Sequence, residues 1–292
     1  MVLTHRAFLQ PFLFILCAAA AFFTTGCTGF DILNAPVSSV GYTRHVDIPY
    51  GNIPRQKLDI YQPRGAEPNA PVVIFFYGGE WSAGEKGNYR FAGEALSSEG
   101  FIAVLPDYRL YPHVTFPAFV EDAAKSVRWV HDNIARFGGD PSRIYLMGHS
   151  AGAQIAVLLS LDPHYLADVG LNRNMIRATA GLSGPYDFLP YGDDRLVFNM
   201  KATDKAPPDA MEPIHFADGH APPMLFIQGG KDQVVDPSNA TEMQQKICKA
   251  GGYAKAIIYP DMAHEGIVIA LASPWRWLAP VLKDSAEFFR EH

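Results

Sequence analysis

The chain has little cysteine, no excess of basic residues and no internal repeat. Three cysteines in 292 residues are too few for the disulfide framework of a small secreted protein. Lys and Arg number 24 against 30 Asp and Glu, and the resulting net charge of −6 argues against a nucleic-acid binder. Low-complexity linkers are absent too. What the sequence does have is 48% hydrophobic residues, which is a globular composition with enough apolar material for one large core.

The N-terminus differs from the rest of the chain. Residues 1–26 hold one charged side chain, Arg6, and the run from Ala7 to Phe23 is nearly all apolar. At 17 residues the run is shorter than the ~20 that a membrane-spanning helix needs. A short charged start, an apolar run and small residues after it are the layout of a secretory signal. We therefore predict that residues 1–26 are a signal peptide.

The end of this segment, Gly26-Cys27, resembles a bacterial lipobox. The resemblance implies cleavage before Cys27, lipidation of its thiol, and a tether over residues 27–42. The protein is then expected to be exported and held at a membrane. Thr28 is not the aspartate that retains such lipoproteins at the inner membrane, which favours the outer membrane or cell envelope over a soluble periplasmic or secreted protein. Plain signal cleavage and an uncleaved anchor remain alternatives.

With Cys27 lipidated, no disulfide can form within the mature chain, whose other cysteine is Cys248. Cys248 falls in a predicted helix over 241–250. There we expect it to be a small buried apolar residue rather than a nucleophile.

The order of elements predicts an α/β fold. Apolar runs at 72–76, 101–105 and 144–147 are typical of strands buried on both faces, as in parallel sheets. Apolar residues at spacings of three or four from Phe116 to Ile134 predict a helix. Further strands are expected at 44–48, 57–61, 178–182, 224–227 and 256–259, and further helices at 89–98, 151–161 and 275–290. Alternation of this kind predicts a mostly parallel central sheet with helices on both faces over residues 43–292. Residues 186–221, polar and rich in proline, break the pattern and are expected to form a short lid insertion.

Residues 148–152 read Gly-His-Ser-Ala-Gly between a predicted strand and a predicted helix. In that context G-x-S-x-G places a serine on a strained turn at the sheet edge, so we predict that Ser150 is a nucleophile. The flanking glycines keep side chains out of the tight crossing. The helix start adds a positive end near a developing oxyanion.

Three stretches carry a family resemblance: Gly78-Gly79-Glu80-Trp81, Asp107-Tyr108-Arg109 and the long run 138–152. With them the chain resembles the α/β-hydrolases, and within that fold the esterases that include kynurenine formamidases and prenylcysteine methylesterases. The resemblance implies an α/β-hydrolase fold, hydrolysis of small esters and no cofactor.

The same resemblance implies an oxyanion hole formed by the backbone of Gly79, Glu80 and Ala151. Tyr77 stands where the family usually has histidine. The Glu80 carboxylate would repel an oxyanion, so we expect it to point away, although recognition of a cationic substrate group is an alternative. Trp81 is a candidate substrate-binding residue that either lines the acyl pocket or packs.

A serine nucleophile needs a base, and in this fold the chain order is serine, acid, histidine. His264 follows the last predicted strand and is the expected base. The resemblance implies Asp232 as the acid, with Asp187 as a competitor. Asp236 is expected to cap a helix, and Asp107 to form a structural ion pair or turn.

His215, Asp218 and His220 could be read as metal ligands, but their spacing fits no known zinc pattern, so no metal site is expected. The favoured function is a serine esterase acting on short acyl chains. An arylformamidase and a non-catalytic binding lipoprotein are the alternatives. Export favours the esterase over the formamidase, because N-formylkynurenine arises in the cytoplasm.

Overall fold

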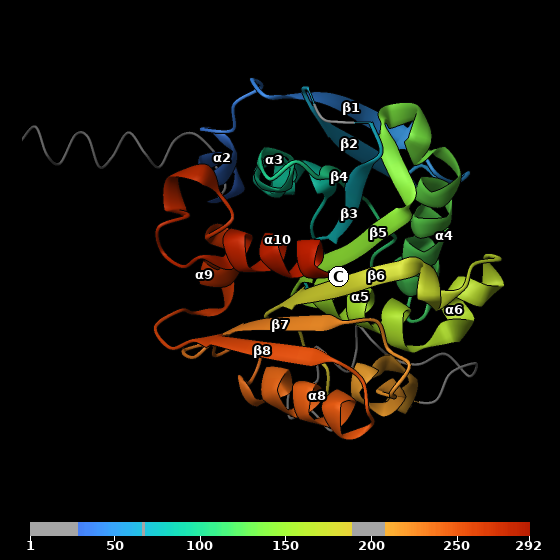
Figure 1. Cartoon of the computed structure of the whole chain (residues 1–292), viewed down its shortest axis with the longest axis vertical. Helices are drawn as coiled ribbons and strands as arrows, with labels where there is room; N and C mark the ends of the chain where they lie inside the picture. The colour runs from blue at the N-terminus through green and yellow to red at the C-terminus, as the bar shows by residue number, and fades with distance from the viewer. Residues whose placement is uncertain (1–28, 66–67, 189–207) are drawn as a thin grey trace, which may run out of the picture.

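The computed structural model describes residues 29–65, 68–188 and 208–292, and within them the chain forms an eight-stranded sheet (Figure 1). The strand order is β1-β2-β4-β3-β5-β6-β7-β8. β2 pairs antiparallel with β1 and with β4, and the pairings from β4 through β8 are parallel. The strands are β1 (Tyr42–Pro49), β2 (Lys57–Pro63), β3 (Ala70–Phe76), β4 (Ile102–Pro106), β5 (Gly139–His149), β6 (Ile176–Leu182), β7 (Met224–Gly229) and β8 (Ala254–Tyr259).

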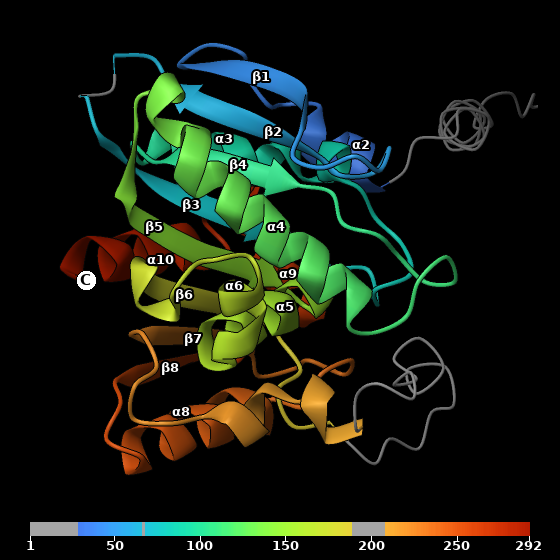
Figure 2. The same cartoon turned by 90° about the vertical axis from the view of Figure 1, so that its right-hand side faces the viewer.

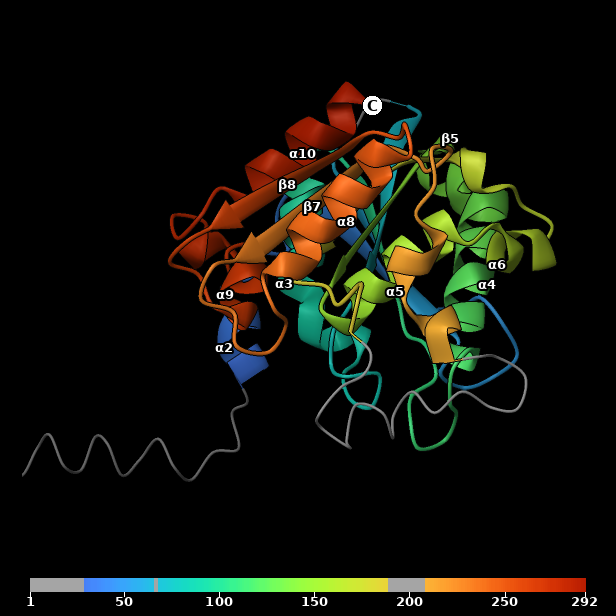
Figure 3. The same cartoon turned by 90° about the horizontal axis from the view of Figure 1, so that it is seen from below.

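Helices cover both faces of this sheet. α3 and α10 pack on one face, and α4, α5 and α8 on the other (Figures 2 and 3). The described helices are α2 (Gly29–Asn34), α3 (Arg90–Ser98), α4 (Ala118–Asn133), α5 (Ala151–Leu161), α6 (Pro163–Asp168), α8 (Ser238–Lys249), α9 (His264–Ile269) and α10 (Val281–Glu291). No helix among these described segments is both long and apolar enough to cross a membrane. The predicted signal peptide and Cys27 lie outside the described residues.

The predicted strands are confirmed, and those in the middle of the sheet are buried on both faces. All five residues of β4 are buried, as are six of the seven in β3. α5, which follows the predicted nucleophile, is buried along its whole length. Helices on both faces require this continuous apolar pattern, and the sequence could therefore reveal it.

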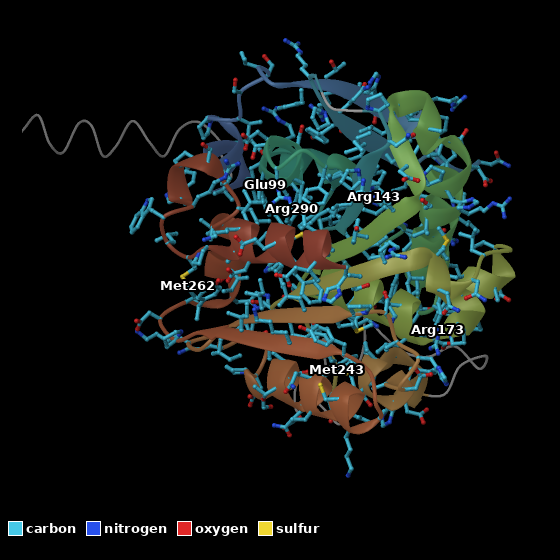
Figure 4. The ribbon with its side chains drawn as sticks, viewed as in Figure 1. Glu99, Arg143, Arg173, Met243, Met262 and Arg290 are labelled. Atoms are coloured by element: carbon cyan, nitrogen blue, oxygen red, sulfur yellow. The ribbon has the colours of Figure 1, made fainter. Side chains whose placement is uncertain are left out.

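The last helix begins later than predicted. We expected a start near Trp275, whereas α10 begins at Val281. The intervening residues form a short 3₁₀ turn (Ser273–Trp275) and an irregular stretch that ends at Pro280. A residue before proline disfavours helical backbone, so Ala279 cannot continue a helix into Pro280. α10 is then joined to the end of α3 by an ion pair between Arg290 Nη2 and Glu99 Oε2 at 2.7 Å (Figure 4).

The segment expected as a loop and tether before β1 starts instead with helix α2, which packs against the domain. The Phe30 ring lies 5.2 Å from the Tyr89 ring. Asn34 accepts a hydrogen bond from the backbone N–H of Phe91 at 3.1 Å and donates one to the carbonyl of Asn88 at 2.9 Å. It thus satisfies one of the backbone donors that the first turn of α3 leaves open. No sequence pattern indicated this contact.

Cys248 lies on α8 as expected, but it is exposed, so the prediction of a buried cysteine is wrong. α8 buries one stripe, which includes Met243 and Ile247, against β7 and β8 (Figure 4). The position after Ile247 faces away from that stripe.

Candidate active site

Ser150 sits on a sharp turn between β5 and α5. Its backbone φ is +53° and ψ is −122°, a conformation that costs a non-glycine residue about 1–3 kcal/mol. The glycines on either side are required by space. A Cβ on Gly148 would lie 2.2 Å from the carbonyl oxygen of Gly152, and one on Gly152 would lie 2.1 Å from that of Phe76. The strained turn therefore lifts one hydroxyl above the end of the sheet.

His264 and Asp232 form a buried pair at the same end of the sheet. His264 is the first residue of α9, after β8, and Asp232 follows β7. The Nδ1 atom of His264 lies 2.8 Å from Oδ2 of Asp232, and the two side chains are 7% and 0% exposed. His149, the residue before Ser150, packs against this pair: its ring centroid is 5.0 Å from that of His264. Ser150, Asp232 and His264 each follow the end of a parallel strand (β5, β7 and β8), so all three lie at the same edge of the sheet.

Further donors hold the Asp232 carboxylate. The backbone N–H groups of Val234 and Val235 donate to Oδ1, each at 2.9 Å, and Gln228 Nε2 donates to Oδ2 at 2.8 Å. Gln228 was not predicted, because a buried glutamine within an apolar strand carries no signal of its own. Burial raises the pKa of Asp232, but the hydrogen bond from His264 and those from the backbone outweigh it and hold the pKa below its usual value. The carboxylate is thus ionised at neutral pH and accepts the Nδ1 proton of His264.

Asp187, the competing acid, is exposed, and its backbone N–H donates to Asn239 Oδ1 at 2.9 Å. In this structure the hydrogen-bonded partner of His264 Nδ1 is Asp232. Asp236 accepts from the N–H of Ser238 at the start of α8 at 2.8 Å, in keeping with its predicted capping role.

The loop after β3 contains Gly79 and Glu80, two of the three residues predicted to donate to an oxyanion. Gly79, Glu80 and Trp81 have φ values of +130°, +53° and +53°. Three successive residues thus have positive φ, which non-glycine residues rarely adopt. A Cβ on Gly79 would lie 2.3 Å from the carbonyl oxygen of Ala83, which makes glycine necessary there. Ala151 stands at the other side, in the first turn of α5, where backbone N–H groups have no acceptor within the helix. The Glu80 side chain is exposed.

The sequence of this chain matches a known protein family. The sequence pattern of the BD-FAE family matches residues 58–247, which run from within β2 to within α8 and contain Ser150 and Asp232. The chain belongs to the BD-FAE family.

Curated relatives of this BD-FAE chain are esterases by name. A probable isoprenylcysteine alpha-carbonyl methylesterase of Oryza sativa subsp. japonica is 32% identical over 238 residues, which are 75% of this chain and 58% of that protein. The esterase LipQ of Mycobacterium tuberculosis is 29% identical over 257 residues, 82% of this chain and 61% of that protein. The chain therefore spans less than two thirds of the length of these relatives.

Solved structures show that the fold is that of the α/β-hydrolases. Esterase 2 of Thermogutta terrifontis in its apo form has a TM-score of 0.72 at 23% identity, covering 88% of this chain and 96% of that one. A truncated carbohydrate esterase from gut microbiota has a TM-score of 0.70 at 21% identity, covering 87% and 98%.

Tyr77 stands where the esterases that this sequence resembles usually have histidine, and the structure shows how the loop is held. Tyr77 stacks on Tyr108 with ring centroids 4.6 Å apart, and Tyr108 donates its hydroxyl proton to the carbonyl of Tyr77 at 2.7 Å. Arg55 donates to the Tyr77 hydroxyl at 2.8 Å and also hydrogen-bonds the carbonyl oxygens of Tyr108 and Gly84. A guanidinium thus joins both sides of the loop, and nothing in the sequence around Arg55 predicted it.

Trp81 packs in the interior. It is 1% exposed, its ring lies 6.2 Å from Phe119 and 6.3 Å from Phe188, and its Nε1 donates to Gln154 Oε1 at 3.1 Å. Of the two roles left open by the sequence, packing is the one that these contacts describe.

Other predicted polar residues have structural partners. Asp107 accepts a hydrogen bond from the Lys86 backbone N–H at 2.7 Å, the structural role expected of it. Among the candidate ligands, Asp218 forms an ion pair with Arg173 at 2.8 Å and His215 contacts Glu212 at 3.0 Å. In the described part of the chain no cluster of three such side chains could hold a metal ion.

His149 is buried between Gly78 and His264. Its Nε2 donates to the carbonyl of His264 at 3.4 Å, while its Nδ1 has no hydrogen-bond partner among the described residues. Burial, and then the charge of the neighbouring His264, lowers the pKa of His149 to about 3. The ring is therefore neutral in the folded protein.

This neutral ring makes stability depend on pH. Between about pH 3 and 6.5 the unfolded chain binds a proton at His149 that the folded chain does not, so acidification favours unfolding. We expect His149→Gln to flatten the fall in the free energy of unfolding below pH 6.5, by up to about 1.4 kcal/mol per pH unit. Urea unfolding at a series of pH values measures the two slopes. Equal slopes for the variant and the natural protein would contradict the assignment.

Proposed function

We propose that this protein is a serine hydrolase that cleaves carboxylic esters, with Ser150, His264 and Asp232 as its catalytic triad. The observation that carries the proposal is the strained turn at Ser150 beside the buried Asp232–His264 pair. The names of the relatives support ester hydrolysis as the reaction.

The residues divide the reaction as follows. His264 removes the proton of Ser150 as its oxygen attacks the ester carbonyl, while Asp232 fixes the Nδ1–H tautomer and stabilises the imidazolium. The backbone N–H groups of Gly79, Glu80 and Ala151 bind the oxygen that becomes negative. His264 returns the proton to the leaving alcohol, and water then hydrolyses the acyl-enzyme by the same steps.

We further propose that short acyl chains are preferred. The indole of Trp81, which directly follows Gly79 and Glu80, is packed against the rings of Phe119 and Phe188. We infer that these packed rings close one side of the acyl site and leave little room for long chains. Each methylene is worth only about 1–3 kcal/mol in discrimination. The preference is therefore expected to be graded rather than absolute.

A panel of p-nitrophenyl esters from acetate to dodecanoate, run beside N-formylkynurenine, tests both statements. We expect kcat/KM to be highest for acetate or butyrate and to decline beyond about eight carbons. A maximum at long chains would contradict the small acyl site. A higher kcat/KM for N-formylkynurenine than for every ester would identify an arylformamidase instead.

For the location we propose an exported lipoprotein anchored through Cys27, from the lipobox-like Gly26-Cys27. Metabolic labelling with an alkyne-bearing palmitate tests it. The natural chain and the matched control Cys248→Ser are expected to take up label, and Cys27→Ser to take up none. Label retained by Cys27→Ser, or absent from the natural chain, would exclude this anchor.

A further inference from the structure

The oxyanion hole of the proposed enzyme is assembled from two separate elements. Gly79 and Glu80 belong to the loop after β3, whereas Ala151 belongs to the first turn of α5. The distance and angle between these donors depend on how the loop is fixed to the helix. Because a misplacement of about 1 Å can cost a hundredfold in rate, any side chain that fixes the loop to α5 matters for turnover.

Gln154 is such a side chain. It lies on α5 one turn after the nucleophile, and its backbone N–H donates to the carbonyl of Ser150 at 3.1 Å. Its Oε1 accepts the indole Nε1–H of Trp81 at 3.1 Å. Trp81 directly follows the donors Gly79 and Glu80, so this bond joins the two halves of the hole. Gln154 is fully buried and Trp81 is 1% exposed, so water does not compete for the bond.

The amide nitrogen of Gln154 also makes a hydrogen bond. Gln154 Nε2 donates to the carbonyl of Met211 at 2.8 Å. The next residue, Glu212, accepts from the N–H of Phe188 at 2.6 Å, and the Phe188 ring is one of the two that pack on Trp81. One acceptor and one donor on opposite sides fix the orientation of the amide, which cannot flip without breaking both bonds.

The loop needs this support because its backbone is strained. Glu80 and Trp81 both have φ near +53°, at a cost of about 1–3 kcal/mol each, and such conformations persist only where the surroundings hold them. The Trp81 carbonyl accepts a hydrogen bond from Tyr111 N–H at 2.9 Å, but that bond leads away from α5. The Gln154 bond is the one through which the indole is connected to the helix of the nucleophile.

We propose that Gln154 is a positioning residue for catalysis: through the Trp81 indole it holds the oxyanion loop in register with Ser150 and Ala151. The inference rests on the proposed ester hydrolysis, since its effect is on the transition state of that reaction. Gln154 does not touch the substrate. Its removal is expected to lower kcat and to leave KM nearly unchanged.

Three variants test this: Gln154→Met, which keeps the volume and removes both polar groups; Trp81→Phe, which removes the indole N–H; and the double variant. We expect each single variant to lower kcat about tenfold per titrated active site, with KM within about twofold. The double variant should be no slower than the slower single one, because both changes remove the same bond. Active sites are counted with a fluorophosphonate.

Stability separates positioning from a merely structural role. Gln154→Met leaves the indole N–H buried without an acceptor, and the added Trp81→Phe removes that orphan donor, so the double variant should lose less Tm than the two single variants together, while kcat stays low. Ser160→Ala is the matched control: Ser160 is buried on the same helix and hydrogen-bonds Thr179 at 2.6 Å, so its loss should lower Tm and leave kcat unchanged.

Recovery of kcat in the double variant would overturn the inference, as would unchanged kcat in both single variants. A natural protein that reacts with no fluorophosphonate and hydrolyses no ester would instead overturn the proposed function.

Discussion

Ser150→Ala is expected to reduce ester turnover by at least about 10⁴-fold, because no other group can take the place of the attacking oxygen. Alanine fits the turn sterically, and the φ of +53° is already imposed by the flanking glycines and the helix. The variant should therefore fold with an unchanged circular dichroism spectrum. Turnover of p-nitrophenyl acetate by the purified variant measures the loss.

A serine of similar burial provides the control. Ser126 on α4 is fully buried and donates to the Ala123 carbonyl at 2.7 Å, so Ser126→Ala should retain both activity and fluorophosphonate labelling. Label that persists on Ser150→Ala would locate the nucleophile elsewhere and remove the basis of the proposed mechanism.

Asp232→Asn is expected to lower kcat by about 10⁴-fold, whereas Asp187→Asn should change it by less than about twofold. The buried carboxylate of Asp232 accepts the Nδ1 proton of His264 at 2.8 Å and so leaves Nε2 free to act as the base. An asparagine amide in the same place can present its N–H₂ group to Nδ1. The ring then carries its proton on Nε2, and it cannot accept one from Ser150.

The aspartate pair is compared by kcat and KM on one short ester, with Tm recorded for each variant. Equal losses for the two, or a greater loss for Asp187→Asn, would reassign the acid. A loss in Asp232→Asn that appeared only in KM would also contradict the proposed role, since tautomer control acts on the chemical step.

Much of the fold could be predicted because local patterns determine it. Strands buried on both faces must be apolar throughout, and 72–76 and 101–105 are. The turn at Ser150 requires glycines at fixed offsets, since Gly148 and Gly152 contact backbone atoms closer than any Cβ allows. Such requirements leave a signature within a few residues, and the sequence analysis could find them.

The residues that were missed act over long separations. Asn34, Arg55, Gln154 and Gln228 each make two or three side-chain hydrogen bonds, most of them to partners far along the chain. A single polar residue in a predicted strand or helix forms no local pattern, so its role cannot be predicted until its hydrogen-bond partner is known. The exposure of Cys248 was missed for a related reason: the helix was predicted, but not which of its faces packs on the sheet.

The docking of α2 limits how far a lipid anchor could hold the protein from a bilayer. Cys27 precedes Gly29, the first residue of α2, by two positions, and an extended chain spans at most about 3.6 Å per residue. A lipid on Cys27 would thus hold α2 within roughly 7 Å of the lipid-bearing residue. The Phe30 ring packs at a tilt against Tyr89, which stacks in turn on Tyr77 at the oxyanion loop. An anchored domain would therefore stay close to the bilayer surface. Ester substrates that partition into that surface would be present near the domain at a raised local concentration.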